Sequence, residues 1–375
     1  MTARLATIHA TVGAAMLLAA SCDAPSSTVA AAGPRADDTT RTQPVVYGGD
    51  DRTEWFHARD AAVRDLAAAS TVALVRSPAT VHGDGTVTFD VPTLGRSRGL
   101  CPGERFAEQP RAAACSGTLI DDDLVLTAGH CMEEADDCDL VQFVFNLRYE
   151  SEGQLAEIVA SRDLYTCSDV VALRKADGID YAIVRLDRPV AAPHRPARVE
   201  RSPIPVGFEE TMVMLGFGAG VPLKIDEGGR VRNPRARSLD YFVASVDAFS
   251  GSSGSGVFDR SLRLRGVLAR GAEDFERDGD CNRVRVQPEV IDEAAEGVVY
   301  AHHAIEALCA LDPTALPCRG EPGDCMPCSA ALPCAGDATC ATAAGAATGA
   351  EAAGGRGQST EPAGHLRRAG APGPS

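Results

Sequence analysis

The sequence is short of basic side chains. It has 36 lysines and arginines against 52 aspartates and glutamates, so its formal charge is −16 at pH 7 and its pI is near 4.9. A phosphate backbone or an anionic membrane surface repels a chain of this charge. We therefore expect no nucleic acid among its partners. The acidity is typical of a soluble extracellular protein.

Methionine is also scarce, with 6 residues, whereas glycine and proline number 37 and 23. Glycine and proline form turns, and their abundance is typical of many short strands joined by loops. The hydrophobic fraction of 45% is ample for at least one core. The composition therefore favours an all-β fold, and the sequence has no internal repeat at a fixed period.

The chain lacks an N-terminal apolar run long enough to span a membrane. Its apolar stretch from Ala10 to Ala20 follows Arg4 and is too short for a stable anchor. This order of charge, apolar stretch and small residues predicts an export signal over residues 1–22. The sequence Leu-Ala-Ala-Ser-Cys ending at Cys22 resembles a bacterial lipobox, which predicts lipidation of Cys22 and a membrane tether. The alternative is an ordinary signal peptide that contains a stray cysteine.

Cysteine, by contrast, is in excess. The 13 cysteines are far more than a reduced cytosolic enzyme carries, so they support export. A zinc site is not expected, because Cys325 and Cys328 lack a second Cys-x-x-Cys pair, and we expect no metal or other cofactor. Beyond Cys22 the cysteines fall into two groups, which predict two separately crosslinked units. The groups are Cys101, Cys115, Cys131, Cys138, Cys167 and Cys281, then Cys309, Cys318, Cys325, Cys328, Cys334 and Cys340.

Sequence pattern divides the chain into segments. Residues 23–44 lack apolar periodicity, which predicts a flexible tether or propeptide. Residues 341–375 are rich in alanine and glycine without a pattern, which predicts a disordered tail. Residues 312–340 contain too little apolar material for a core without disulfides. Residues 45–311 carry the strand patterns, with helices expected at 60–70 and 302–311. Strands are expected at 71–75, 87–91, 116–120, 124–127, 141–149, 181–186, 212–217, 239–246, 256–258, 265–270 and 298–301.

One histidine lies in a motif with a chemical meaning. Hydrolysis of an amide by acyl transfer needs a nucleophile, a base, a group that orients the base, and donors for the oxyanion. The candidate base is His130, in Leu-Val-Leu-Thr-Ala-Gly-His130-Cys131 at the end of a predicted hairpin. This stretch resembles the histidine region of the trypsin and chymotrypsin family, where the motif is Thr-Ala-Ala-His-Cys. The resemblance implies a disulfide between Cys115 and Cys131.

The candidate nucleophile is Ser253, in Phe-Ser-Gly-Ser-Ser253-Gly-Ser-Gly-Val-Phe. This element resembles Gly-Asn-Ser-Gly-Ser-Pro-Val-Phe of glutamyl endopeptidases and their bacterial relatives. Gly251 allows a turn in which the amides of Gly251 and Ser253 face one point, as an oxyanion hole requires. Register with the flanking glycines selects Ser253 over its neighbouring serines. The alternative is a serine-rich turn without chemistry.

The candidate orienting acid is Asp180, in Gly-Ile-Asp180-Tyr-Ala-Ile-Val-Arg-Leu. This stretch resembles the family's Asp-Ile-Ala-Leu-Leu-Lys-Leu strand. An aspartate before a buried strand can accept the proton on the second nitrogen of an imidazole. Asp177 is the alternative, although its polar surroundings favour a turn. The order His130, Asp180, Ser253 is also the family's order.

The resemblance extends over residues 45 to about 310. It implies two antiparallel six-stranded β-barrels with a short C-terminal helix, followed here by a small cysteine-rich segment. It implies a monomeric serine endopeptidase that acts on protein or peptide substrates, and the export signal puts it outside the cell or on its surface. The alternative is an inactive trypsin-like scaffold kept as a surface adhesion module, because a fold does not fix a function.

Two departures from digestive trypsins concern activation and specificity. Ser252 stands where those enzymes have the aspartate that pairs with a new N-terminal amine, so that ion pair cannot form. Asp247 lies six residues before Ser253, the offset at which trypsin-like enzymes have the carboxylate that binds lysine or arginine. We expect Asp247 and Gly271 to bind substrate. The alternative for Asp247 is a strand-end hydrogen bond. Glutamate specificity is not expected, because the strand after the nucleophile has no histidine.

Overall fold

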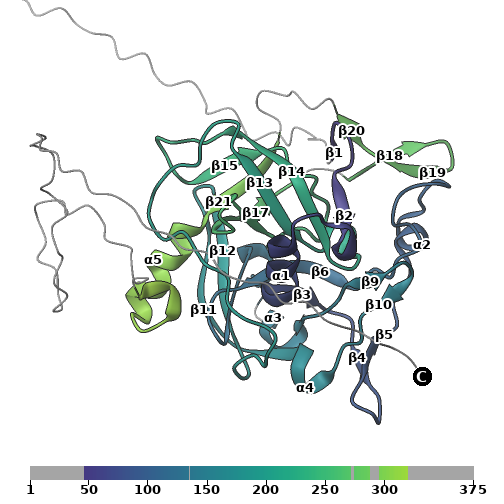
Figure 1. Ribbon diagram of the computed structural model, residues 1–375, viewed down its shortest axis with the longest axis horizontal. Coiled ribbons are helices and arrows are strands. Elements are labelled where there is room, and N and C mark those ends of the chain that lie inside the picture. Colours follow the sequence, from purple (N-terminus) through teal and green to yellow (C-terminus); the bar gives the residue numbers. More distant parts are fainter. Residues whose placement is uncertain (1–45, 135, 272–273, 288–294, 320–375) are drawn as a thin grey trace, which may run out of the picture. The chain divides into compact units, whose positions relative to one another are not determined.

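The structure is a computed structural model, and it describes residues 46–134, 136–271, 274–287 and 295–319. The chain divides into two compact units, residues 1–321 and 322–375, and every described residue belongs to the first. The predicted signal, tether and tail lie outside the described residues, as do Cys22 and the last four cysteines. Strands outnumber helices among the described residues of the first unit (Figure 1).

The first barrel is a closed antiparallel sheet of six strands in the order β11-β12-β7-β6-β3-β8. The hairpin β6–β7 and the strand β12 carry the motifs of His130 and Asp180, so barrel closure brings these two motifs together. Apolar side chains fill its interior, including Leu74, Leu126, Phe143 and Ile183. The strands are β3 Thr71–Val75, β6 Ala113–Leu119, β7 Leu124–Thr127, β8 Gln142–Val144, β11 Leu164–Ala176 and β12 Ile179–Leu186.

The second barrel has the strand order β13-β16-β17-β21-β15-β14 and closes through pairing of β13 with β14. A short strand, β2 (Arg52–Glu54), adds to the outer side of β14. The core of this barrel includes Met212, Phe242, Val257 and Val298. Its strands are β13 Thr211–Gly216, β14 Lys224–Asn233, β15 Tyr241–Ala244, β16 Gly256–Phe258, β17 Leu264–Arg270 and β21 Glu296–Tyr300. The expected class of two six-stranded antiparallel barrels is confirmed.

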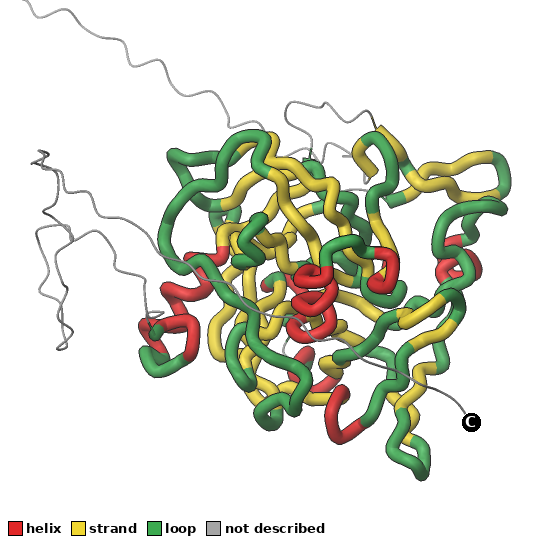
Figure 2. The backbone as a smooth tube through the Cα atoms, viewed as in Figure 1, coloured by secondary structure: helices red, strands yellow, loops and turns green. Residues whose placement is uncertain are grey.

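Two longer helices, three short ones and several small strand pairs complete the described unit, as the tube drawing shows (Figure 2). Helix α1 (Ala61–Ser70) begins where the Asp60 side chain accepts a hydrogen bond from Ala62 N–H. Helix α5 (Ala301–Leu311) ends the second barrel, as predicted. The short helices are α2 Leu94–Arg98, α3 Asp137–Leu140 and α4 Ala160–Asp163, with 3-10 turns at Trp55–His57, Gly129–Cys131, Gly218–Gly220 and Leu316–Cys318. The outlying strand pairs are β1 Val46–Tyr47 with β20 Val286–Gln287, β4 Ala79–Val81 with β5 Val87–Phe89, β9 Tyr149–Ser151 with β10 Gln154–Leu155, and β18 Phe275–Asp278 with β19 Cys281–Val284.

The observed strands differ from the predicted ones where burial is one-sided or absent. Strand β11 is not predicted, because most of its side chains are exposed or half-buried and it therefore lacks an apolar repeat. The strand expected at 141–149 is split into β8 and β9. The strand expected at 87–91 is the short β5, which pairs with β4 outside both barrels. The predicted helices at 60–70 and 302–311 differ from α1 and α5 by one residue at one end.

Four disulfides crosslink the described unit. Cys115 bonds Cys131, Cys138 bonds Cys167, and Cys101 bonds Cys281 across 180 positions of sequence. The first cysteine group therefore pairs within itself. The fourth bond, Cys309 to Cys318, joins α5 to the turn that follows it.

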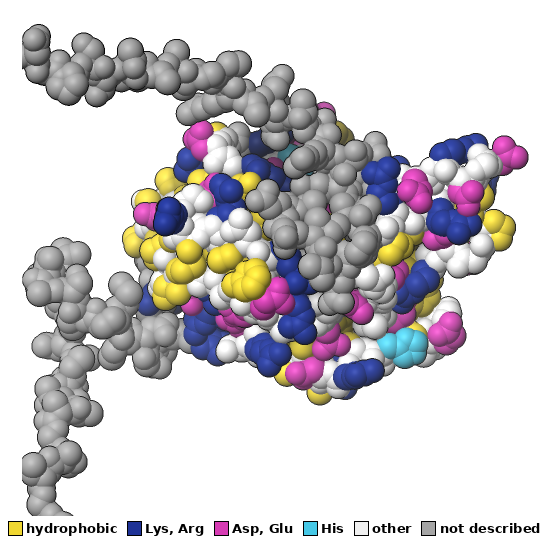
Figure 3. All heavy atoms as spheres, turned by 90° about the horizontal axis from the view of Figure 1, so that it is seen from above, with side chains coloured by type: hydrophobic (Ala, Val, Ile, Leu, Met, Phe, Trp, Pro, Cys, Tyr) yellow, Lys and Arg dark blue, Asp and Glu magenta, His cyan; other side chains and the backbone are white. Residues whose placement is uncertain are grey.

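The surface mixes both signs of charge. On the face seen in Figure 3, lysine and arginine side chains are interspersed with aspartate and glutamate. Within the described ranges, no helix is both long and apolar enough to cross a membrane.

Candidate active site

The candidate base His130 is held in position by hydrogen bonds from both its backbone N–H and its ring. It lies in the 3-10 turn Gly129–Cys131 after β7, and β12 beside it begins with Ile179 and Asp180. The His130 N–H donates to Asp180 Oδ1 at 3.0 Å, and Nδ1 lies 2.8 Å from Oδ2. Both carboxylate oxygens therefore orient the histidine. The ring stays 30% exposed, which leaves Nε2 available for chemistry.

The carboxyl group of Asp180 is held in its ionised form. Burial acts to raise its pKa, but hydrogen bonds from the His130 ring and from the His130 and Gly129 N–H groups outweigh burial. The pKa of Asp180 therefore lies below its usual range. An ionised carboxylate fixes the proton on Nδ1, so that Nε2 can act as a base.

The candidate nucleophile Ser253 lies in a tight turn between β15 and β16. Gly251 has φ 103° and Gly254 has φ 86°, conformations that a residue with a side chain rarely adopts. The Ser252 hydroxyl accepts a hydrogen bond from Phe249 N–H at 3.1 Å, which closes the turn locally. Ser253 itself is half-buried.

The backbone N–H groups of this turn differ in whether they have an acceptor. Ser252, Gly254 and Ser255 donate their N–H groups to backbone carbonyls of the protein. Among the described residues, the N–H groups of Gly251 and Ser253 have no such acceptor. These are the two donors expected for an oxyanion hole.

Ser116, on β6 of the first barrel, forms hydrogen bonds to the turn that contains Ser253 (residues 249–255, the nucleophile turn). Its N–H donates to the Ser253 carbonyl at 2.7 Å, and its hydroxyl donates to the Gly251 carbonyl at 2.8 Å. The same hydroxyl accepts from Phe217 N–H at 2.9 Å. The sequence offers no signal for this role, because it depends on contact between the two barrels.

His130 and Ser253 line the same hollow, whose volume is about 380 Å³. Within the described chain, no hydrogen bond joins Ser253 Oγ to the His130 ring. Such bonds are often long without substrate and shorten in the reacting complex. Gly271, which is expected to bind substrate, also lines the hollow, with Leu268, Ala269 and Asp274.

Asp247 does not line this hollow, which corrects its expected role as the acid of the specificity pocket. Its side chain is buried, and its two carboxylate oxygens accept the N–H groups of Tyr47 at 3.0 Å and Asp51 at 2.6 Å. The physical reason is that the segment leading into β2 occupies the carboxylate. The hydrogen-bonding alternative for Asp247 describes its position better.

Asp226 accompanies Asp247 in the same buried place. The Asp226 carboxylate accepts the Asp247 N–H at 2.7 Å, and oxygens of both groups and of Asp51 lie within 4.8 Å of one another. Burial raises the pKa of Asp226 and Asp247, and neighbouring carboxylates raise both further. These two groups therefore resist ionisation in the folded protein.

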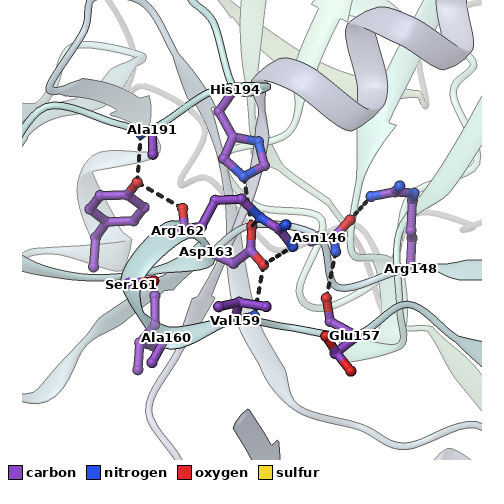
Figure 4. A network of polar contacts seen from close by, with 12 residues as sticks. Asn146, Arg148, Glu157, Val159, Ala160, Ser161, Arg162, Asp163, Ala191 and His194 are labelled. Carbon is purple, nitrogen blue, oxygen red and sulfur yellow. Dashed lines mark hydrogen bonds and ion pairs between the residues drawn. The ribbon is translucent and has the colours of Figure 1, made fainter. Parts of the chain in front are cut away.

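A second histidine–aspartate pair lies in the first barrel and has a structural role. His194 Nε2 lies 2.9 Å from Asp163 Oδ1, and Arg162 and Val159 N–H complete the bonding of that carboxylate (Figure 4). His194 stacks on Phe145 and its side chain is only 2% exposed. No hydroxyl is bonded to its ring among the described residues. Of these two pairs, the His130 pair is the one that opens onto a hollow lined by a serine.

Part of the chain is similar to a known family of peptidases. Residues 115–267, which include His130, Asp180 and Ser253, match the family model of the trypsin-like peptidase domain. No curated protein matches the chain. Three solved structures are similar to it at low identity: two peptidases and one inactivated protease paralogue.

The first of these structures is a Glu endopeptidase in complex with MPD, 16% identical, with 71% of this chain and 98% of that chain covered and a TM-score of 0.41. The second is kallikrein-related peptidase 10, 15% identical, covering 53% and 89%, with a TM-score of 0.36. The third is an inactivated protease paralogue of the scabies mite, 17% identical, covering 70% and 97%, with a TM-score of 0.41.

Proposed function

Because residues 115–267 match the family model of the trypsin-like peptidase domain, we propose that the chain is a serine endopeptidase that works through an acyl-enzyme. The observation that carries this proposal is the His130–Asp180 pair, which opens onto the same hollow as Ser253. The unpaired N–H groups of Gly251 and Ser253 support it further.

The proposed reaction has two halves. Ser253 Oγ attacks the substrate carbonyl carbon while His130 Nε2 takes the hydroxyl proton, and the N–H groups of Gly251 and Ser253 receive the oxyanion. His130 then gives its proton to the leaving amine as the peptide bond breaks. Water, deprotonated by His130, attacks the acyl group, and the proton returns to Ser253 as the acid product leaves. Asp180 stays ionised throughout.

We further propose that this peptidase acts outside the cell on protein or peptide substrates, either released or tethered through a lipid on Cys22. Four disulfides in the described unit are typical of exported proteins. A cut before Val45 would release a mature chain from the tether. Mature N-terminal sequence distinguishes these forms, since a lipidated chain begins at Cys22 and a released one at Val45.

The proposed cleavage preference is for the bond after lysine or arginine. Because Asp247 is occupied by the Tyr47 and Asp51 N–H groups, another acid must serve this preference. Asp274, which lines the hollow, is buried and is one candidate.

Peptide hydrolysis by Ser253→Ala tests the proposal. We expect the folded mature protein to hydrolyse a mixed peptide library and the variant to lose at least about 10³-fold in kcat. The matched control is Ser261→Ala at an exposed turn, which should keep the activity. If the correctly folded wild type hydrolyses no peptide in the library, the alternative of an inactive binding module replaces this proposal.

A further inference from the structure

Glu296 is a buried acidic residue that pairs with no lysine or arginine among the described residues. It is the first residue of β21, and none of its surface is exposed. The Tyr47 hydroxyl donates to Oε1 at 3.3 Å, while Oε2 has no hydrogen-bond partner among the described residues. Buried carboxyl groups are normally paired, because leaving one uncompensated is costly. The free oxygen of Glu296 therefore points to a ligand.

The free oxygen lies against the wall of the hollow that contains Ser253. A β-carbon built on Gly271 would be 2.8 Å from Glu296 Oε2. Strand β17 runs beside β21, with Arg270 opposite Gly297, so the end of β17 meets the start of β21 (Figure 1). Because Gly271 lines the hollow and has no side chain, nothing larger than hydrogen separates its Cα from the carboxylate.

Other acidic side chains lie near Glu296. Burial raises the pKa of Glu296 well above its usual range, and the charges of Asp274 and Asp247 raise it further, although the Tyr47 hydroxyl acts in the opposite direction. Asp274 lines the hollow and accepts the Ser250 N–H on both oxygens, at 2.9 and 3.0 Å. An incoming cation would therefore meet carboxyl groups at the wall and behind it.

The nearest arginine along the wall is directed elsewhere. Arg270 is exposed, and its guanidinium carbon lies 4.5 Å from the centre of the Tyr241 ring. Among the described residues, no lysine or arginine pairs with Glu296. The described residues that line the hollow therefore supply no positive charge to Glu296.

We propose that Glu296 receives the ammonium or guanidinium group of a substrate lysine or arginine immediately before the cleaved bond. This inference rests on the proposed peptidase function and identifies its specificity residue. A cation brought past Gly271 would pair with Oε2 in a desolvated place, where charge-assisted hydrogen bonds are strong. Asp274 would add attraction at the entrance. The role expected of Asp247 thus passes to a residue on a different strand.

Two peptides that differ only in charge test this assignment. Lysine and norleucine have side chains of similar length, so the ratio of their kcat/KM values isolates the contribution of the cation. We expect wild type to prefer lysine by at least about tenfold, and Glu296→Gln to reduce this ratio to about one. Glu306→Gln on the exposed side of α5 is the control and should keep the wild-type ratio.

A second variant acts by occupying the space beside the carboxylate. Gly271→Ala would put a methyl group where the cation has to pass, so the preference for lysine should fall as in Glu296→Gln. Benzamidine, an aromatic cation, should slow fluorophosphonate labelling of the wild type, and it should do so much less in either variant. Thermal unfolding of each variant verifies that it is folded.

The outcomes separate this inference from the proposed function. If wild type reacts with a fluorophosphonate at Ser253 but cleaves norleucine and lysine peptides equally, the role of Glu296 is wrong and the peptidase proposal stands. A preference for lysine that survives Glu296→Gln and disappears in Asp274→Asn also overturns it. If the folded wild type does not react at all, the peptidase proposal itself fails.

Discussion

Ser252 shows how one side chain changes the way the nucleophile turn is built. Its hydroxyl accepts the Phe249 N–H, so the turn is closed by a hydrogen bond within four residues. A digestive trypsin has an aspartate at this place and needs a new N-terminal amine to pair with it. Here Gly251 already has φ 103°, and no distant charge is required to hold it. We infer that the oxyanion donors form without chain cleavage.

Asp180→Asn tests the orienting role of the carboxylate. An amide in place of the carboxylate can present a donor to His130 Nδ1, which would put the imidazole in the wrong tautomer for catalysis. We expect kcat to fall by about 10⁴-fold on the best peptide, with little change in fold. Steady-state kinetics and circular dichroism measure the two effects. Retention of more than about a tenth of wild-type kcat would exclude this role for Asp180.

Individual residues differ in how well the local sequence predicts their position. His130, Asp180 and Ser253 could be proposed because each lies in a local motif with its neighbours in the chain. The offset of Asp247 from Ser253 predicts a place in the pocket, but the offset does not reveal that the Tyr47 and Asp51 N–H groups bind its carboxylate. Glu296 and Ser116 carry no motif at all. Their contacts arise only when β21 meets the end of β17 and when β6 meets the nucleophile turn.

At the scale of elements, the N-terminal segment is joined to the second barrel through buried acid groups. Tyr47 and Asp51 N–H bind Asp247, and Asp247 N–H binds Asp226 on β14. The segment thus lies beside the strand that leads to the nucleophile turn. Its attachment depends on backbone donors rather than on a terminal amine.

The acid pair Asp226 and Asp247 should make folding stability depend on pH. Their folded pKa values are raised above the unfolded value of about 3.9, so the stability they contribute is complete below that pH and is lost as the pH rises through the raised values. We expect the free energy of unfolding to fall between pH 5 and pH 8, at up to about 1.4 kcal/mol per pH unit for one proton.

Urea unfolding at several pH values measures this slope. Asp247→Asn should flatten it, whereas Asp90→Asn at an exposed position should leave it unchanged. A stability that rises from pH 5 to pH 8 in wild type, with the same slope in Asp247→Asn, would contradict the assignment of raised pKa values to this pair.

Elements also differ in how well sequence predicts them. The strands β3, β7, β12 and β16 are buried along most of their length, and their apolar runs could be read directly. Strand β11 has mainly exposed side chains, and in β14 two adjacent glycines interrupt the alternation of buried and exposed side chains. Neither strand therefore has a clear two-residue apolar period. Pairing with neighbouring strands, rather than their own pattern, makes them strands.

At the scale of the whole molecule, the Cys101–Cys281 disulfide links distant parts of the chain. It joins the loop after α2 to the β18–β19 hairpin, which follows Asp274 in the sequence. In the chain-entropy account, a crosslink stabilises more when the loop it closes is longer. This bond closes 180 positions, whereas Cys309–Cys318 closes 9.

Paired substitutions test this difference. Cys101→Ala with Cys281→Ala should lower the free energy of unfolding by about 5 kcal/mol, and Cys309→Ala with Cys318→Ala by about 3 kcal/mol. Denaturant unfolding of both double variants gives the comparison. An equal or reversed order would show that strain or residual structure, rather than loop length, controls these crosslinks.

Our central proposal is that the two barrels bring His130, Asp180 and Ser253 together as one reactive centre. Reaction with a fluorophosphonate probe, followed by peptide mapping of the adduct, tests it most directly. We predict one adduct per folded mature chain, located on Ser253, and no adduct in Ser253→Ala. An adduct on another serine, equal labelling of the variant, or an unreactive folded wild type would contradict the claim.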